Sequence, residues 1–281
     1  GVYLRNMSLF ITSLNSGSNG NCYYIGNTTE AVLIDAGIAC REVEKRMTRL
    51  SLSLTKVKAI FVSHEHGDHI HGVPGLARKY KLPVYITPST LRNSSLRLPE
   101  QQVHPFEAYK SITVGGLSVT PFPKHHDADD PHSFVVSQDN VRVGVFTDIG
   151  FPCRHVIYHF QQCHAAFLEA NYDVDMLENG SYPLALKNRI RKGMGHLSNI
   201  QALKLFNEHR PAYMSHLILS HLSRNNNKPS LVEKLFISHS GRTKIIVASR
   251  SKETPVLRVD PIHGFSTTYE KPLLYQQLRL F

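Results

Sequence analysis

The chain has 281 residues, of which 41% are hydrophobic, so it is long enough for one large domain with a substantial core. No apolar run approaches about 20 residues, the first residues lack a signal-peptide pattern and the four cysteines form no CxxC pair, so we expect a reduced cytoplasmic protein without a membrane span. The 32 Lys and Arg exceed the 22 Asp and Glu to give a net charge of +10, which attracts polyanions such as nucleic acid, although many basic proteins bind none.

Apolar segments bounded by turn residues predict strands along most of the chain, and a turn at Asp139-Asn140 joins two of them. The order, first strands and then strands mixed with helices, predicts two sheets covered by helices in a single domain, 1–281, with residues 264–281 as a C-terminal arm or tail. The predicted strands are Ser8–Thr12, Cys22–Gly26, Ala31–Asp35, Lys58–Ser63, Pro83–Thr87, Leu117–Pro121, Ser133–Ser137, Val141–Thr147, Ala166–Glu169, His216–Leu219, Lys244–Ala248 and Val256–Val259. The predicted helices are Cys40–Leu50, Gly75–Tyr80, Pro183–Arg191, Ser198–Glu208 and Ser230–Ser238.

The segment FVSHEHGDHIHG, residues 61–72, follows a predicted buried strand and is rich in titratable side chains. It contains His64, His66, Asp68 and His69 in the order HxHxDH. Neutral imidazoles and carboxylates are the usual ligands of zinc and related ions, so this spacing predicts a metal site. The alternative is a polar surface loop with spare histidines. His71 lies outside the spacing and is expected to be exposed or to support the site.

HEHGDH resembles the signature of the metallo-β-lactamase fold superfamily, and further stretches follow the metal-site order of that superfamily. Each of them comes directly after a predicted strand. The resemblance covers roughly residues 13–249 and implies an α/β fold, the four-layer αββα sandwich, with metal ions at the edge between the sheets. The stretches are LIDAG with Asp35, KHHDADDP with His125 and His126, FTDIG with Asp148, and LSHLS with His221.

The resemblance implies two divalent ions, zinc or manganese. It assigns His64, His66 and His126 to the first ion and Asp68, His69 and His221 to the second. Asp148 is expected to bridge both ions, with Asp35 supporting the histidine loop from behind. His126 is preferred to His125 because a branch of the superfamily places its ligand directly before an Asp-Ala pair, so His125 is expected to lie beside the site.

That branch is the YycJ/WalJ branch, which four stretches resemble: SGSNGNC (16–22), LEANYDVDML (168–177), YPLALKNRIRKGMGHLSN (182–199) and SHLSRNNN (220–227). The resemblance implies a 5′-to-3′ DNA exonuclease. It implies no β-CASP cap domain, because no insertion of that size separates Glu169 from His221. A hydroxide bridging the ions is expected to attack phosphorus, with Asp68 and His196 as catalytic residues. His196 is a candidate phosphate contact or general acid, weighed evenly against a residue that only caps a helix.

Several polar residues around these motifs are expected to contact substrate or support the ligands. The loop 16–21 could present backbone N–H groups to a terminal phosphate, although a plain turn would look the same. The basic run 187–192 fits either a solvated helix face or a DNA-backbone contact. The expected substrate contacts are Ser16, Ser18, Asn19, Asn21, Arg224 and Ser198, the last being alternatively a helix N-cap. Glu169 and Asn171 are expected to support the ligands.

Other functions would share the same ligand set. A thioesterase or lactamase acting on a small molecule, a phosphodiesterase acting on RNA or a nucleotide, and a non-enzymatic metal protein are the alternatives. The net charge and the GHLSN segment favour nucleic acid, and DNA first. The sequence predicts no oligomeric state.

Overall fold

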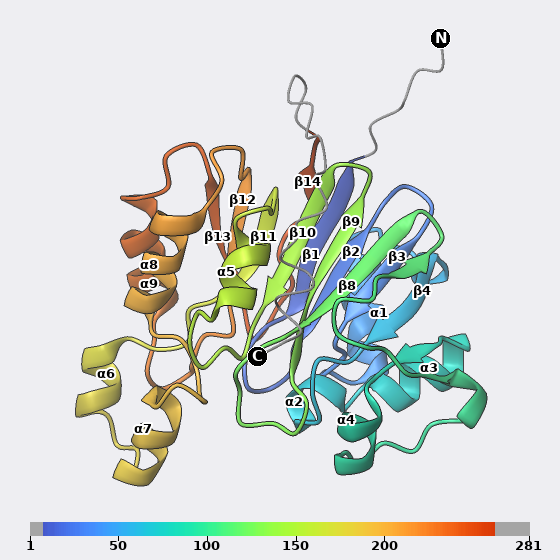
Figure 1. Ribbon diagram of the computed structural model, residues 1–281, viewed down its shortest axis with the longest axis horizontal. Coiled ribbons are helices and arrows are strands. Elements are labelled where there is room, and N and C mark those ends of the chain that lie inside the picture. The colour runs from blue at the N-terminus through green and yellow to red at the C-terminus, as the bar shows by residue number, and fades with distance from the viewer. Residues whose placement is uncertain (1–7, 262–281) are drawn as a thin grey trace.

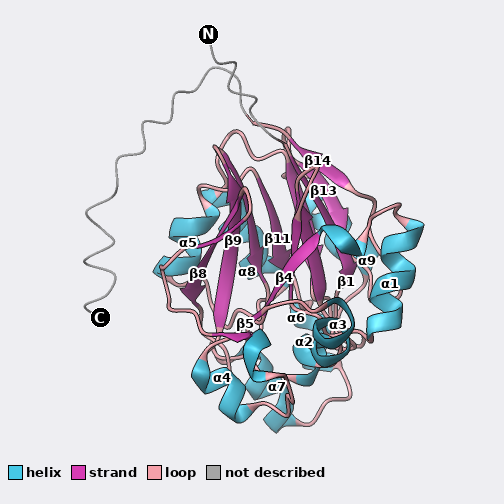
Figure 2. Ribbon diagram, turned by 90° about the vertical axis from the view of Figure 1, so that its right-hand side faces the viewer, coloured by secondary structure: helices cyan, strands magenta, loops and turns pink. Residues whose placement is uncertain are grey.

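Two seven-stranded sheets lie face to face in the computed structural model, which describes residues 8–261. Figure 1 shows helices on the outer side of each sheet, and Figure 2 shows the same sandwich after a quarter turn. The predicted four-layer αββα sandwich is therefore confirmed. The expected arm at residues 264–281 lies outside the described residues.

The first sheet combines the N-terminal strands with the last strand of the chain. Its order is β14-β1-β2-β3-β4-β5-β6, antiparallel from β14 to β3 and parallel from β3 to β6. Its strands are β1 (Leu9–Asn15), β2 (Cys22–Gly26), β3 (Ala31–Ile34), β4 (Val57–Phe61), β5 (Val84–Tyr85), β6 (Val103–His104) and β14 (Leu257–Val259).

The second sheet has the order β13-β12-β11-β10-β9-β8-β7. It is antiparallel from β7 to β10 and parallel from β10 to β13, where strands such as Ala165–Glu169 are buried along their whole length. The predicted turn joins β9 to β10, with Asp139 at φ 49°. Its strands are β7 (Ile112–Val114), β8 (Leu117–Pro123), β9 (His132–Gln138), β10 (Val141–Phe146), β11 (Ala165–Glu169), β12 (His216–Ser220) and β13 (Lys244–Val247).

Apolar side chains fill the space between the sheets and the space under each helical layer. Phe61 of the first sheet meets Phe134 of the second at 5.7 Å between ring centroids. Burying one such side chain contributes about 1.5–3 kcal/mol to folding. α1 and α3 cover the first sheet through residues such as Met47, and α5, α8 and α9 cover the second through residues such as Phe206. These layers hold the sheet edges in fixed positions.

The helices are α1 (Cys40–Arg49), α2 (Gly67–Ile70), α3 (Val73–Tyr80), α4 (Pro88–Asn93), α5 (Arg154–Phe160), α6 (Val174–Asn179), α7 (Leu184–Arg191), α8 (Asn199–His209) and α9 (Pro229–Ile237), with 3₁₀ turns at Leu54–Lys56 and Glu100–Gln102. Figure 1 shows α2, α4, α6 and α7 together at the lower end of the sandwich. No helix within residues 8–261 is long and apolar enough to cross a bilayer.

The predicted strands and helices are present, with boundaries that shift by one to three residues. The sequence did not predict β6, β7, α4, α5 or α6, which are short. In α5 only Val156 and Phe160 are apolar and fully buried, so its helical period is weak. The connection between β11 and β12 contains only α6, α7 and α8, so the described residues include no cap domain there.

Candidate metal centre

Side chains from both sheets meet at one edge of the sandwich, where several strands end. Asp35 follows β3 directly, and His64 lies just beyond β4. In the second sheet, β8 and β10 run in the same direction because both are antiparallel to β9, and β11 and β12 are parallel to β10. His126, Asp148 and His221 follow three of these strands, so their side chains reach one edge.

Three of these positions have a left-handed backbone. The φ angle is 58° at Asp35, 54° at Asp148 and 56° at His221. Residues other than glycine rarely adopt this conformation, which costs about 1–3 kcal/mol each and persists where the surroundings enforce it. Such residues cluster at functional sites, which agrees with a site at this sheet edge.

The HxHxDH segment is held against the chain that follows β3. It continues as extended chain to His66 and then forms the short helix α2. The carbonyl of Asp68 accepts a hydrogen bond from the backbone N–H of Asn21 at 2.7 Å, and a Cβ on Gly37 would overlap this carbonyl. The carbonyl of His69 accepts from the backbone N–H of Ala36 at 2.9 Å. These contacts fix the loop before any ion is bound.

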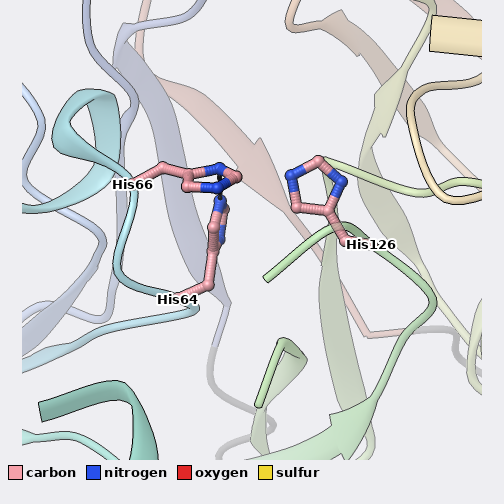
Figure 3. Close-up of side chains that lie close together, drawn as sticks. All are labelled: His64, His66 and His126. Atoms are coloured by element: carbon pink, nitrogen blue, oxygen red, sulfur yellow. Dashed lines mark hydrogen bonds between the residues drawn. The ribbon is translucent and has the colours of Figure 1, made fainter. Parts of the chain in front are cut away.

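Three histidines form the first candidate ligand set. Figure 3 shows the rings of His64, His66 and His126 gathered together, with nitrogen atoms of His64 and His66 3.1 Å apart. The His126 ring lies 4.9 Å from the ring of His64 and 5.2 Å from that of His66, measured between centroids. One nitrogen from each residue lies within 4.8 Å of the others, close enough to share one ion.

Asp68, His69 and His221 form the second candidate ligand set. The Oδ2 atom of Asp68 lies 3.6 Å from Nε2 of His69 and 3.5 Å from Nε2 of His221. Their ligand atoms also lie within 4.8 Å of one another. The two sets use no common residue, so the structure offers space for two ions.

Asp148 lies between the two sets. Its Oδ2 is 3.1 Å from Nε2 of His69, and its Oδ1 is 3.7 Å from Nε2 of His126 and 3.4 Å from Nδ1 of His221. One carboxylate therefore reaches histidines of both sets. This is the position that the sequence predicted for a bridging ligand.

Several buried polar atoms at the centre have no hydrogen-bond partner among residues 8–261. They are Nε2 of His126, Nε2 of His221 and Oδ2 of Asp148. An unsatisfied buried polar atom costs about 1–3 kcal/mol, and a bound cation would satisfy all of them. Imidazole nitrogens with carboxylate oxygens suit zinc and manganese. The residues present therefore fit the divalent ions that the sequence predicted.

Asp35 supports two of the histidines from behind. Its Oδ2 accepts a hydrogen bond from Nδ1 of His69 at 2.7 Å and from the Ser63 hydroxyl at 2.8 Å. The Ser63 oxygen lies 2.9 Å from Nδ1 of His64. With Nδ1 occupied in this way, Nε2 of each histidine is left for an ion, so Asp35 has the supporting position predicted for it.

Glu169, the last residue of β11, orients His221 and His196. Its Oε1 accepts from Nδ1 of His221 at 2.9 Å and from Nδ1 of His196 at 2.8 Å. Asn171 donates to the His221 carbonyl at 2.7 Å, and the Ser16 hydroxyl accepts from the His221 backbone N–H at 2.7 Å. Glu169 and Asn171 therefore lie where the sequence predicted, behind the ligands. Ser16, predicted as a substrate contact, is buried and bonded to the ligand backbone.

The two ligand sets differ in electrostatics. Burial lowers the pKa of His64 well below its usual value, and burial together with Lys124 lowers the pKa of His126 to about 4. Burial also disfavours the charged form of His69. The negative charges of Asp148 and Asp35 outweigh the effect of burial and raise the pKa of His69 to about 10. In Asp68 burial is outweighed by the positive charge of His69, which lowers the pKa to about 2. His64 and His126 of the first set are thus neutral imidazoles, whereas Asp68 and His69 of the second set carry charge.

His196 and Ser198 lie at the start of α8 but contact different groups. The Ser198 hydroxyl accepts from the backbone N–H of Gln201, and the Gln201 side chain accepts from the Ser198 N–H in return, which makes Ser198 the N-cap. His196 instead bonds to Glu169, and its side chain is 22% exposed. The structure shows no capping hydrogen bond from the His196 side chain, so it does not support the interpretation of His196 as a helix cap. The His196 ring lies 5.1 Å from the His221 ring, measured between centroids.

The loop between β1 and β2 divides into an inner and an outer part. Asn21 is buried, donates to Oδ2 of Asp68 at 3.2 Å and accepts from the Gly17 N–H at 3.0 Å. Ser18 and Asn19 are exposed at the tip. They line a hollow of about 380 Å³ beside Asp68, and Ser18 also lines a hollow of about 210 Å³ beside His196 and His221.

The remaining predicted residues lie around this centre. His125 is exposed and stacks on Phe151 at 4.4 Å between ring centroids, so it points away from the ligands that surround His126. His71 is exposed in the wall of the larger hollow. Arg224 is exposed, three residues after His221.

Sequence reasoning missed two residues of the centre. Ser63 connects Asp35 to His64, and Lys124 is buried with its Nζ donating to the Thr147 carbonyl at 2.7 Å. Burial lowers the pKa of Lys124, while the charge of Asp148 raises it. The only signal in the sequence is their position next to ligands, in VSH and KHH.

Comparisons with known proteins agree with the fold. The family model described as "Beta-lactamase superfamily domain" matches residues 30–222. A Bacillus anthracis protein named exodeoxyribonuclease YycJ is 33% identical, covering 80% of this chain and 86% of its own. A Streptococcus pneumoniae protein named exodeoxyribonuclease WalJ is 31% identical, and the match again covers 80% of this chain and 86% of the relative. The metallo-β-lactamase fold protein YhfI from Bacillus subtilis superposes with a TM-score of 0.69 at 15% identity, over 90% of this chain and 99% of its own.

Proposed function

Because the chain belongs to the β-lactamase superfamily and is a hydrolase of the metallo-β-lactamase fold, as its motifs predicted, we propose that it is a dinuclear-metal phosphodiesterase. The proposed activity is 5′-to-3′ exonuclease action on DNA. Similar proteins of nearly the same length are named exodeoxyribonucleases, which supports both the substrate class and removal from an end.

The pair of His196 and Glu169 is the observation that carries phosphodiester cleavage. Hydrolysis of a phosphodiester expels an alkoxide, which needs a proton as it leaves. Hydrolysis of a thioester expels a thiolate, which can leave without a proton because the pKa of a thiol is only about 8.5. A thioesterase therefore gains little from a proton donor at this place. The hydrogen bond from Nδ1 of His196 to Oε1 of Glu169 leaves the other ring nitrogen for the leaving group.

The chain's own residues would divide the reaction in the following way. Two divalent ions, held by the sets described above, would neutralise the scissile phosphate and supply an activated water nucleophile. Asp68, fixed by Asn21, would help to hold the second ion and the attacking water in line. His196 would donate a proton to the leaving 3′ oxygen, while the Glu169 carboxylate stabilises its positive form. The product would be a 5′-mononucleotide.

The cleft beside the ligands also carries groups suited to a polyanion. The smaller hollow is lined by His196, Arg189 and Ser18, and the chain as a whole has a net charge of +10. Positive charge near a site raises the local concentration of an anionic substrate. This supports a nucleic acid in preference to an apolar thioester.

A digestion panel with added zinc or manganese tests the proposal. Purified protein is incubated with duplex DNA bearing a 5′-phosphate or a 5′-hydroxyl, single-stranded DNA, RNA, a small nucleotide diester, a thioester and a lactam. We expect mononucleotides released from DNA 5′ ends, and no release by Asp68→Ala. Turnover of the thioester or lactam with all nucleic acids intact would reject the proposal, and cleavage of RNA alone would replace DNA by RNA.

A further inference from the structure

Two arginines lie beside the metal centre without a carboxylate partner. Arg224 follows the ligand His221 by three residues, and Arg250 follows the end of β13, which is parallel to β12. Neither forms a salt bridge with a carboxylate of residues 8–261. The Nη1 atom of Arg250 is buried and has no hydrogen-bond partner in that part of the chain. Both side chains are thus available to an anion.

The two positive charges also act on each other. Burial lowers the pKa of Arg250, and the charge of Arg224 lowers it further. Bringing like charges together without an acid destabilises the free protein, and a bound anion would remove this cost. Arg224 is exposed and Arg250 is half-buried, so a bound anion could reach both guanidinium groups from the solvent side.

The backbone around Arg250 is fixed to the loop between β1 and β2, and it lies close to the segment that follows β12. Its carbonyl accepts from the Asn19 side chain at 2.8 Å, and the preceding carbonyl, of Ser249, accepts from the Ser16 N–H at 3.1 Å. Gly17, at φ 144°, lies between Arg250 and Leu222: a Cβ there would stand 3.3 Å from Arg250 Cβ and 3.7 Å from the Leu222 carbonyl. Any larger residue at this position would be strained and would crowd Arg250.

The same region borders the hollow beside His196. Ser223 and Tyr182 line that hollow, and the Tyr182 hydroxyl accepts from the side chain of Asn225, the neighbour of Arg224. Tyr182 is also close enough to Arg250 to raise its pKa slightly. The segment that carries Arg224 therefore borders the hollow beside His196, and Arg250 lies across Gly17 from Leu222 of that segment.

We propose that Arg224 and Arg250 form an anion subsite that binds a phosphate of the substrate other than the one being hydrolysed. This inference rests on the proposed function, because it requires a substrate with more than one phosphate. A guanidinium is planar and always charged, and it binds phosphate oxygens in pairs, so two of them suit a phosphate better than a carboxylate or a nucleobase. Neither residue takes part in bond breaking. Both position the strand.

Equilibrium binding tests this subsite without relying on hydrolysis. The metal-loaded protein is titrated into a fluorescein-labelled, phosphorothioate-protected oligonucleotide, and anisotropy is measured at several salt concentrations. We expect Arg224→Gln/Arg250→Gln to bind at least about tenfold more weakly, with the salt slope reduced by about one to two. Arg242→Gln is the matched control, because Arg242 precedes the start of β13 whereas Arg250 follows the end of the same strand. It should match the wild type.

Further variants and substrates keep the outcome decisive. If the double variant does not fold, Arg224→Gln alone and Arg250→Lys replace it; the lysine should keep the salt slope but weaken binding. Oligonucleotides with a 5′-phosphate or a 5′-hydroxyl identify the phosphate: loss of discrimination indicates the terminal phosphate, and equal weakening of both indicates an internal diester. Wild-type affinity and slope in the arginine variants would overturn the subsite. Tight binding without hydrolysis of any nucleic acid would instead defeat the proposed function and leave the subsite standing.

Discussion

The candidate metal centre lies beside a wall formed by α7 and the segment after β12, and the two are built differently. At the centre Asp35, Asp148 and Glu169 are buried and Asp68 is 22% exposed, and Asp148, 2% exposed, contacts histidines of both sets. On the wall the charged side chains are exposed, such as Arg189, which is 60% exposed and pairs with Asp127. The centre is preorganised before substrate arrives, whereas the wall is held loosely.

This difference separates two kinds of effect. Buried, multiply bonded charges interact strongly, because water does not screen them and removing one leaves its partners unsatisfied. Exposed ion pairs contribute about 0–1 kcal/mol. Substitutions at the centre should therefore abolish turnover, and substitutions on the wall should weaken substrate binding moderately. The predictions below test this division, beginning with the largest expected effect.

Neighbouring histidines offer the sharpest test. His126→Ala removes a buried member of the first ligand set, and we expect kcat to fall at least about 10³-fold with loss of one bound ion. His125→Ala, one residue away, removes an exposed ring that stacks on Phe151, and kcat should stay within about twofold. Metal content by mass spectrometry of the intact protein, together with DNA hydrolysis, measures both. The reverse pattern would mean that the ligand was assigned to the wrong histidine.

The fold and the place of the candidate ligands were predictable because the motifs that resemble the superfamily each follow a strand, while the ligand assignment itself stays a prediction. HxHxDH follows one strand, and Asp35, Asp148 and His221 each follow another, so parallel strands bring them to one edge regardless of the details of packing. The choice of His126 over His125 came from a resemblance, and the structure agrees by burying His126 alone of the two.

The supporting contacts were less predictable because they depend on tertiary packing. The sequence does not show that Asn21 and Ser16 turn inward, or that Ser63 links Asp35 to His64, since each contact joins segments far apart or depends on a rotamer. α5 was missed because its burial comes from the second sheet and not from its own periodicity. The arginine pair joins residues that are 26 positions apart in the sequence, 250 against 224, which follow the ends of the parallel strands β13 and β12.

His196 tests the boundary between centre and wall. His196→Ala should lower kcat by about 10²–10⁴-fold while both ions stay bound and the melting temperature is nearly unchanged, because its ring bonds to Glu169 and does not cap a helix. Ser198→Ala, two residues on, should do the opposite: it removes the α8 N-cap, costs about 1 kcal/mol of unfolding free energy and keeps kcat. If His196→Ala is fully active but less stable, His196 belongs to the fold and has no chemical role.

The two ligand sets should also respond differently to pH. The pKa of His69 is raised from 6.5 to about 10 without an ion, so an ion must displace its proton, and apparent affinity at the second set should increase as pH rises through that range, by about tenfold per unit for one proton. The pKa of His126 is lowered to about 4 and that of His64 is lowered as well, so affinity at the first set should change much less than at the second as pH rises above 8. Calorimetric titration with zinc in buffers of different ionisation enthalpy measures both. Parallel pH dependence at the two sites would contradict the electrostatic difference between them.

The smallest expected effect is on the wall. Arg189 lines the hollow beside His196 and pairs with Asp127, directly after the ligand His126. Arg189→Gln should raise KM for DNA about two- to fivefold at low salt with kcat unchanged, and the difference should disappear at high salt because exposed charges are screened. Arg191→Gln is the matched control on the same helix, since its partner is Glu178, away from the hollow. A large fall in kcat for Arg189→Gln would mean that the wall takes part in the chemistry, and that the division between a rigid centre and a loosely held wall is wrong at this point.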